Sequence, residues 1–415
     1  MSDARLPNDC FALPPGVDWT PVDQALEALK AALRPVAKQE SCAVADGLGR
    51  ILSRDVKAVR ANPPAANSAI DGYGFAFAHM AADMPVVEGR AAAGGAYLGA
   101  VPEGSAIRIL TGAVLPDGVD TVVMQEECEL DAGRVRFSAP VKACQNTRKA
   151  GEDVNAGEVA LLAGHKLRAQ DIALLSALGV ASISVYAPLR VGVISTGDEL
   201  VATGQDARPD QTFDANRPML IELSNCWDCV AVDLGHVADR RDMLRRALND
   251  AAEHCDVVLT SGGASGGDED HVSALLREEG VLTHWRIAIK PGRPLALAMW
   301  NGMPVFGLPG NPVAAFVCAL VFARPALSLM AGGGWLAPQG FDLPAAFEKS
   351  KKRGRREFLR ARVSAQGVVK VFASEGSGRI SGLSWAEGLV ELADGARDIR
   401  HGDIVRYIPF ASFGV

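Results

Sequence analysis

Three apolar segments in the second half of the sequence each run directly into a loop rich in glycine, proline or acidic residues. They are Leu189–Ser195, Val257–Thr260 and Pro304–Gly307. Continuous apolar runs of this length are typical of strands buried on both faces of a parallel sheet. Ligands bind at the carboxyl ends of such strands. We therefore expect the three loops to form one shared crevice in a doubly wound α/β domain.

The loops carry residue types suited to a phosphate-bearing substrate and a divalent metal. The loops are Thr196–Glu199, Ser261–Asp270 and Leu308–Pro312. Glycines let backbone N–H groups turn inward and bind an anion, and neighbouring carboxylates can hold Mg²⁺. In the third loop, Asn311 is expected to cap the following helix, with Pro312 at its first position.

A crossover helix is expected over Asp239–His254, where apolar residues recur on one face and Asp239 is placed to cap the start. It would connect Val230–Leu234 to Val257–Thr260 as two parallel strands. Residues 187–330 therefore form one complete doubly wound α/β domain in this interpretation.

The 415-residue chain is too long for a single core, so the remainder must form other domains. Its composition, 48% hydrophobic and 22% charged, is that of a globular protein. A net charge of −7 attracts neither nucleic acid nor an anionic membrane, so neither is expected as a partner. We interpret the basic tract Lys349–Arg356 as a solvated loop.

The sequence favours a cytoplasmic location. Met1–Gly16 lacks the apolar stretch of a signal peptide, and the run Val313–Ala323 is short for a membrane span and is expected to be a buried helix. Eight scattered cysteines fit a reducing compartment. Cys226 and Cys229 have suggestive spacing but lack a second ligand pair, so a helix-to-strand junction is favoured over a metal site.

The first half of the chain predicts a β domain inserted into a helical one. Residues 58–154 show no helical period and contain short β-type runs such as Thr121–Met124 and Arg134–Phe137. The flanking segments, 14–57 and 155–186, are expected to form one elongated, discontinuous domain.

Each flanking segment contains one predicted helix. The first begins with Thr20 as cap and Pro21 at its first position, and the second covers Gln170–Leu178 and ends at Gly179. Beyond Gly332–Gly334, alternating segments predict a C-terminal β-barrel-like domain over residues 336–415.

Seven separated motifs, covering nearly the whole chain, occur in the order found in the molybdopterin molybdenumtransferase family. These enzymes insert the metal in molybdenum cofactor synthesis, and the E domain of gephyrin is their eukaryotic relative. The motifs that resemble the family are Asn67–Tyr73, Ile109–Ala113, Arg148 with Gly151–Val154, Ser195–Leu200, Ser261–Asp270, Ile289–Gly292 and Gly307–Pro312.

The resemblance implies a multidomain homodimer that takes adenylylated molybdopterin from an upstream adenylyltransferase and inserts molybdate. The adenylate would be hydrolysed with Mg²⁺ present, releasing molybdenum cofactor and AMP. The site would lie between the α/β domain of one subunit and the β insertion of the other.

The resemblance also implies which residues carry the reaction. The catalytic carboxylates would be Asp71, Asp153, Glu199, Asp239 and Asp270, with Glu199, Asp239 and Asp270 holding the metal. The substrate-binding positions would be Thr111, Arg148, Ser261, Gly262, Gly263, Ser265, Lys290, Arg293, Pro309, Pro312, Arg360 and Ser377. At Arg293 the family commonly has lysine, and the planar guanidinium of arginine affects how a substrate fits.

These residue types suit the implied chemistry. A phosphoanhydride between two anionic groups needs a hard cation held by carboxylates, and anionic substrates need basic side chains. Structural alternatives remain at four positions. Asp239 would be only a helix cap, Asp71 only a turn residue before Gly72, and Arg148 and Arg360 only surface ion-pair residues.

Other functions explain less of the sequence. Gly263–Gly267 fits the G-x-S-x-G elbow of a hydrolase with Ser265 as nucleophile, but no histidine follows it in a recognisable setting. A molybdopterin adenylyltransferase would resemble only residues 187–330. A non-catalytic, gephyrin-like scaffold would not need the full set of carboxylates.

Overall fold

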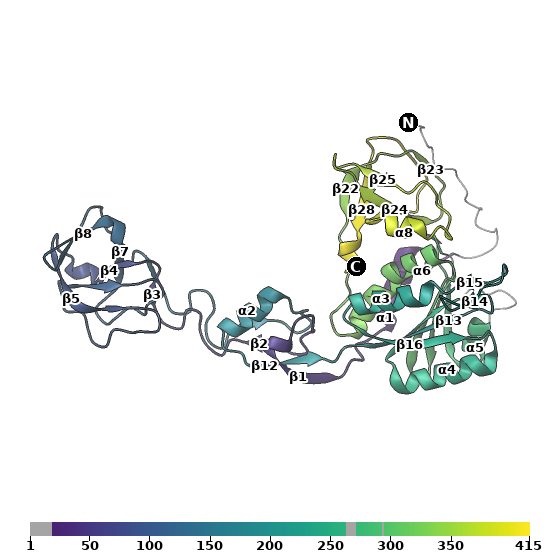
Figure 1. Ribbon diagram of the computed structural model, residues 1–415, viewed down its shortest axis with the longest axis horizontal. Helices are drawn as coiled ribbons and strands as arrows, with labels where there is room; N and C mark the ends of the chain where they lie inside the picture. Colours follow the sequence, from purple (N-terminus) through teal and green to yellow (C-terminus); the bar gives the residue numbers. More distant parts are fainter. Residues whose placement is uncertain (1–18, 263–270, 293) are drawn as a thin grey trace. The chain divides into compact units, whose positions relative to one another are not determined.

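The computed structural model describes residues 19–262, 271–292 and 294–415 and divides into two compact units (Figure 1). One unit comprises Met1–Glu40 and Tyr186–Val415, and the other comprises Ser41–Val185.

The larger unit is built on a six-stranded sheet with the order β16-β13-β17-β21-β20-β18. Its strands are β13 (Arg190–Thr196), β16 (Val230–Val237), β17 (Val257–Ser261), β18 (Val281–Arg286), β20 (Pro294–Trp300) and β21 (Met303–Leu308). The first four strands of the order are mutually parallel, as predicted for the strands that bear the loops. Strands β20 and β18 extend the sheet in antiparallel fashion.

Helices cover both faces of this sheet (Figure 1). One face carries α4 (Arg241–His254) and α5 (His271–Glu279), and the other carries α1 (Val22–Ala32), α3 (Asn216–Cys226), α6 (Pro312–Cys318) and α7 (Arg324–Met330). Successive residues of β13 pack into cores on opposite faces of the sheet: Val193 lies on the α3 side and Ile194 on the α4 side. Burial of both faces explains why the strand is a continuous apolar run.

Two predicted helix starts are wrong. Helix α1 has Pro21 as its N-cap, while Thr20 instead forms a bridge with Ile287. Helix α4 has Arg240 as its N-cap, so Asp239 precedes the helix and is not its capping residue. The Asp239 N–H group donates to Asp198 Oδ1 at 3.1 Å, which holds Asp239 in the loop at the end of β16.

The two predicted helices of the discontinuous domain pack in different cores. Leu29 of α1 joins the core of the larger unit with Phe306 and Leu327, whereas Leu175 of α2 (Ala169–Ala177) packs with Leu52 in the smaller unit. The prediction that both helices share one domain is therefore wrong for α1, because the α/β unit covers its apolar face.

The smaller unit contains a six-stranded sheet with the order β7-β4-β6-β5-β9-β8. Its strands are β4 (Gly72–Phe75), β5 (Met84–Ala91), β6 (Ala106–Ile109), β7 (Thr121–Met124), β8 (Cys128–Asp131) and β9 (Arg134–Phe137). Strands β7 and β9 coincide with the predicted runs. Short pairs connect the flanking segments, namely β1 (Gln39–Ala43) with β12 (Ser182–Tyr186) and β2 (Val56–Lys57) with β11 (Val159–Leu161).

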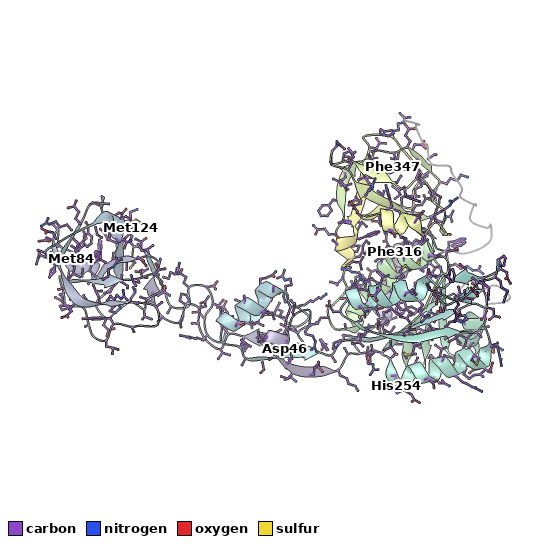
Figure 2. All side chains as sticks on the ribbon, in the orientation of Figure 1. Asp46, Met84, Met124, His254, Phe316 and Phe347 are labelled. Atoms are coloured by element: carbon purple, nitrogen blue, oxygen red, sulfur yellow. The ribbon has the colours of Figure 1, made fainter. Side chains whose placement is uncertain are left out.

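The C-terminal portion of the larger unit is a second six-stranded sheet with the order β19-β24-β26-β28-β22, and β25 pairs with β24. Its strands are β19 (Ile289–Lys290), β22 (Phe341–Pro344), β24 (Arg356–Val363), β25 (Val369–Val371), β26 (Gly388–Leu392) and β28 (Ile404–Pro409). Phe347 belongs to its separate core (Figure 2). Phe316 on α6 contacts Phe410 edge-on with ring centroids 5.2 Å apart, which connects this portion to the helical layer.

The basic tract Lys349–Arg356 is a solvated loop only in its middle: Lys352 and Arg353 are exposed in a turn, whereas both ends of the tract lie on strands. Lys349 and Lys351 are each 3% exposed on β23 (Lys349–Lys351), which pairs with β27 (Arg397–Ile399). Arg356 forms ion pairs with Asp23 and Glu391. These charges are buried because carboxylates and carbonyls of the same unit face them.

The apolar run after Pro312 is a buried helix, as predicted, although it is longer than the run itself. A π-helical segment, Ala319–Ala323, joins α6 to α7 as one continuous helix. Among the described residues, this helix, Pro312–Met330, is the one long and apolar enough to cross a membrane, and 78% of it is buried inside the structure. Such burial is typical of a core helix. Cys226 ends α3 and Cys229 directly precedes β16, so the predicted helix-to-strand junction is confirmed.

Candidate functional site

The loops that follow β13, β17 and β21 meet at one edge of the sheet. Ser261 is in register with Ser195 on one side and with Leu308 on the other. The Gly262 N–H group donates to the Leu308 carbonyl at 3.2 Å, and a Cβ at Gly262 would lie 2.6 Å from the Thr196 carbonyl. Only glycine fits this close approach, which has a φ of +92°. The first residues of the three loops therefore lie together, as predicted, and residues 263–270 of the second loop lie outside the described residues.

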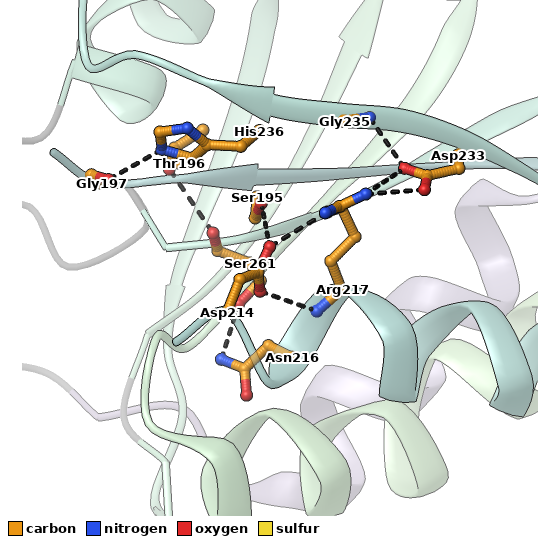
Figure 3. Close-up of polar contacts among 10 residues, drawn as sticks. All are labelled: Ser195, Thr196, Gly197, Asp214, Asn216, Arg217, Asp233, Gly235, His236 and Ser261. Atoms are coloured by element: carbon orange, nitrogen blue, oxygen red, sulfur yellow. Dashed lines mark hydrogen bonds and ion pairs between the residues drawn. The ribbon is translucent and has the colours of Figure 1, made fainter. Parts of the chain in front are cut away.

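Asn216, at the first position of α3, links two of these loops (Figure 3). Its Nδ2 donates to Ser261 Oγ at 2.8 Å and to the Gly310 carbonyl at 2.6 Å, and the residue is 7% exposed. Asn216 was not among the site residues predicted from the sequence. Its signal there was weak, because an asparagine just before an apolar helical stripe usually indicates only a helix start.

Asp214 was missed in the same way, and it connects strand β13 to α3 (Figure 3). Its Oδ2 accepts from Ser195 Oγ at 2.5 Å and from Arg217 Nε at 3.0 Å. Burial alone would raise the pKa of Asp214, but the hydrogen bonds from Ser195 and Arg217 hold this pKa below its ordinary value. Arg217 also binds Asp233 at 2.6 Å, so the network reaches from β13 to β16.

The acidic loop after β13 carries one predicted carboxylate, Glu199, and contacts the loop that carries another, Asp239. A Cβ at Gly197 would lie 2.4 Å from Glu199 Oε2, so the Glu199 carboxylate lies over Gly197. Asp198 binds the Asp239 N–H group, and His236 Nε2 binds the Gly197 carbonyl at 2.8 Å. The loops that carry Glu199 and Asp239 are therefore neighbours.

Glu199 and Asp239 carry carboxylates, the type of side chain that could hold Mg²⁺ here. Mg²⁺ is bound by one or two protein carboxylates and fills its remaining positions with water and phosphate oxygens. Within residues 19–262, 271–292 and 294–415, His, Cys, Asp and Glu side chains form no group of three or more able to hold a metal. A metal at Glu199 and Asp239 would therefore draw its other ligands from Asp270, substrate or water. Gly263, Ser265, Asp270 and Arg293 lie outside the described residues, and with them the hydrolase alternative through Ser265.

A pocket between the C-terminal sheet and the start of α6 brings together Lys290 of β19 and Arg360 of β24. It is lined by Lys290, Pro291, Val313, Phe358, Leu359, Arg360, Phe372, Ser374 and Glu375. Arg360 is 4% exposed and donates to the carbonyls of Ser374, Gly376 and Arg379, so its interpretation as a surface ion-pair residue is wrong.

Ser377, Pro309 and Pro312 lie near the same pocket. The Ser377 carbonyl accepts the N–H group of Val313, the residue that follows Pro312 in α6. A Cβ at Gly292 would lie 3.7 Å from Pro309 Cγ. The proline loop therefore borders both the C-terminal segment and the turn after Lys290.

Three motifs from the first half of the chain gather in the smaller unit. Asp71 Oδ1 accepts from the N–H group and Oγ1 of Thr111 at 2.7 and 2.6 Å. These two hydrogen bonds lower the pKa of Asp71. Arg148, on β10 (Thr147–Arg148), is in register with Asn67 of β3 (Asn67–Ser68).

Asp153 lies in the same unit. Its Oδ2 accepts from Asn62 Nδ2 at 2.9 Å, and its N–H group donates to the Asn62 carbonyl at 3.1 Å. The two contacts hold Asp153, five residues after Arg148 in the chain, against Asn62.

The sheet with helices on both faces, the gathered loops and the appended β portions define a multidomain α/β protein with a ligand site at the carboxyl edge of its parallel strands. Residues 20–179 match the family model described as MoeA N-terminal region (domain I and II). Residues 192–329 match a probable molybdopterin binding domain, and residues 342–410 match the MoeA C-terminal region (domain IV). The chain belongs to the molybdopterin molybdenumtransferase family, which confirms the resemblance found in the seven motifs.

Individual relatives agree with this family. The chain is 34% identical to the molybdopterin molybdenumtransferase of Haemophilus influenzae, with 94% of this chain and 98% of the relative covered. It is 29% identical to gephyrin of Dictyostelium discoideum, covering 94% of this chain and 62% of gephyrin. A solved structure of a molybdopterin biosynthesis moeA protein from Pyrococcus horikoshii has a TM-score of 0.82 at 27% identity, covering 94% of this chain and 100% of that one.

Proposed function

We propose that this protein inserts molybdate into adenylylated molybdopterin, with hydrolysis of the adenylate and release of molybdenum cofactor and AMP. The observation that carries the proposal is the meeting of three loops at the edge of β13, β17 and β21, beside Glu199 and Asp239. This edge lies in the region that matches a molybdopterin-binding domain.

Each part of the edge has a role in this proposal. Asn216 holds the Ser261 loop against the proline loop, so the backbone groups that face the substrate are fixed before it binds. Glu199 and Asp239, together with Asp270, would hold Mg²⁺. When bound, such an ion would supply positive charge to the phosphoanhydride that is hydrolysed.

The basic pocket would receive the oxyanion. Lys290 and Arg360 line it, and Ser377 borders it through the first turn of α6. Arg293, Gly263 and Ser265 would complete the anion contacts. Guanidinium and ammonium groups are the side chains that bind tetrahedral anions most strongly.

The carboxylate and basic side chains of the smaller unit need a second subunit in this proposal. Asp71, Thr111, Arg148 and Asp153 would complete the site of the partner in a cytoplasmic homodimer. Molybdopterin adenylyltransferase would supply the adenylylated substrate. Adenylyl transfer by this chain itself would leave the matches at residues 20–179 and 342–410 without a role.

A reconstitution experiment tests the proposal. Purified protein is incubated with adenylylated molybdopterin, Mg²⁺ and molybdate, and AMP release and cofactor formation are followed together. We expect both products to appear in equal amounts and to require both ions. AMP without cofactor would indicate a hydrolase, and neither product would indicate a non-catalytic scaffold.

A further inference from the structure

Four charged side chains are buried together beside the Lys290 pocket. Glu375 bridges two lysines, since its Oε2 binds Lys290 Nζ and its Oε1 binds Lys349 Nζ. Glu357 Oε2 lies 3.1 Å from Lys349 Nζ and 3.9 Å from Lys290 Nζ. The Lys349, Glu357 and Glu375 side chains are at most 4% exposed, and that of Lys290 is 15% exposed.

Arg360 fixes the segment that carries Glu375. Its guanidinium donates to the carbonyls of Ser374 and Gly376, the residues on either side of Glu375 in the chain. The Arg360 guanidinium also lies 4.9 Å from the Phe372 ring centroid. The Glu375 carboxylate is therefore held in the pocket wall.

With Arg360 included, the charges of this cluster nearly cancel. Lys290, Lys349 and Arg360 contribute three positive charges, and Glu357 and Glu375 contribute two negative ones, which leaves a net charge of +1. Burial would raise the pKa of Glu375, but hydrogen bonds from Lys290 and Lys349 hold this pKa below its ordinary value. Glu375 is therefore ionised at neutral pH.

We propose that Glu375 determines how strongly the Lys290–Arg360 pocket binds a tetrahedral dianion. Its negative charge opposes the anion, and Lys349 limits that effect because it shares the carboxylate with Lys290. Neither Glu375 nor Lys349 was selected from the sequence. The identity of the dianion as molybdate rests on the proposed function, whereas the charge effect itself does not.

Removing the charge of Glu375 and removing the charge of Lys349 should have opposite effects on anion binding. Glu375→Gln raises the net charge of the cluster to +2, and Lys349→Met lowers it to zero at similar volume. Molybdate binding to the full-length protein is measured by equilibrium dialysis, with sulfate as a second probe. We expect Glu375→Gln to tighten binding of both anions about tenfold and Lys349→Met to weaken it about tenfold, the scale of a hydrogen bond to a charged group.

Glu391→Gln is the matched control. Glu391 is a partly buried glutamate on β26 that pairs with Arg356 and Arg406, outside the pocket lining. Its substitution should leave the dissociation constants within about twofold, the range of substitutions that do not touch a site. Weaker binding in both pocket variants would show that the cluster only maintains the fold and would overturn the proposal, as would unchanged binding in Glu375→Gln.

A second measurement tests the proposal even if Glu375→Gln makes the protein less stable. Glu357 still faces both lysines in that variant, and a bound dianion would replace the missing charge. Its thermal midpoint should therefore rise more with added sulfate than the midpoint of the wild type; an equal or smaller rise contradicts the proposal. If the wild type releases no AMP but the opposite shifts in dissociation constant are found, the proposed function fails and this inference stands. If the wild type releases AMP but those shifts are absent, the proposed function stands and this inference fails.

Discussion

Asp71 and Thr111, 40 positions apart in the chain, are joined by two hydrogen bonds to a single carboxylate oxygen. Strand β4 begins directly after Asp71 and pairs with β6, with Gly72 opposite Ile109. That register places the turn after β6 beside the Asp71 side chain. Two motifs identified separately in the sequence are thus one contact in the structure.

The first prediction concerns this contact. Thr111→Val removes the Oγ1 donor and keeps the N–H donor, so the pKa of Asp71 should rise toward its ordinary value. A ¹³C NMR titration of aspartate carboxyl groups measures the change. Thr111→Ser retains the hydroxyl and should titrate like the wild type. Identical titration curves for Val and Thr would show that Oγ1 does not stabilise the Asp71 carboxylate.

The second prediction tests the carboxylates of the larger unit. Glu199→Gln should abolish molybdate-dependent AMP release, because an amide cannot neutralise a metal ion, and Asp270→Asn should have the same effect. The thermal midpoint should stay nearly constant, since substitutions of loop acids away from a core rarely change stability by more than about 0.5 kcal/mol. Asp210→Asn, at an exposed aspartate in the same unit, is the control. Wild-type turnover in Glu199→Gln would remove Glu199 from the site.

The third prediction concerns the bridge made by Asn216. Asn216→Ala leaves the buried Ser261 hydroxyl and the Gly310 carbonyl without this donor, at a cost of about 1–3 kcal/mol in the free energy of unfolding. Urea denaturation of this variant, of Ser261→Ala and of the double variant gives the coupling energy, expected above about 0.5 kcal/mol.

Asn225→Ala is the control for the Asn216 experiment. Asn225 is exposed on the same helix, so its substitution should change stability by less than about 0.5 kcal/mol. Additive effects of Asn216→Ala and Ser261→Ala would contradict a direct contact.

The fourth prediction gives a pH dependence. Hydrogen bonds depress the pKa of Asp214 in the folded state, so they stabilise the fold above the pKa of an unfolded aspartate, about 3.9. That stabilisation is lost as the pH falls through the folded pKa. Ser195→Ala removes one of these bonds and should lower the free energy of unfolding by about 1–3 kcal/mol at pH 7. The difference from the wild type should shrink as the pH falls below about 4. A deficit that does not change with pH would assign the effect to packing.

The fifth prediction tests the proposed homodimer. Asp71→Asn and Glu199→Gln lie in different units, and each variant should be inactive alone. If one subunit supplies Asp71 and the other Glu199, a heterodimer has one intact site. Random exchange should then restore roughly a quarter of wild-type activity. Two affinity tags confirm that heterodimers form. Tagged heterodimers without activity would show that the site is not shared in this way.

The fold of the α/β portion could be predicted because its signals are local. Continuous apolar runs such as Leu189–Ser195 indicated buried parallel strands, and the glycine-rich loops after them indicated a shared edge, which Gly262 confirms. The helix starts at Thr20 and Asp239 were wrong, because tertiary hydrogen bonds hold both residues in other segments. The placement of α1 also depended on contacts with residues far along the chain, including Phe306 and Leu327.

The sequence by itself determined the strand periodicity, the carboxylate-bearing loops and the family, since each is encoded in residues that are neighbours in the chain. Only the tertiary structure decided that Asn216 joins Ser261 to Gly310 and that Glu375 lies between Lys290 and Lys349. Residues separated by 26 to 94 positions meet in these contacts. The reason is physical: a buried polar group must find a partner, and the fold decides which group is within hydrogen-bonding distance.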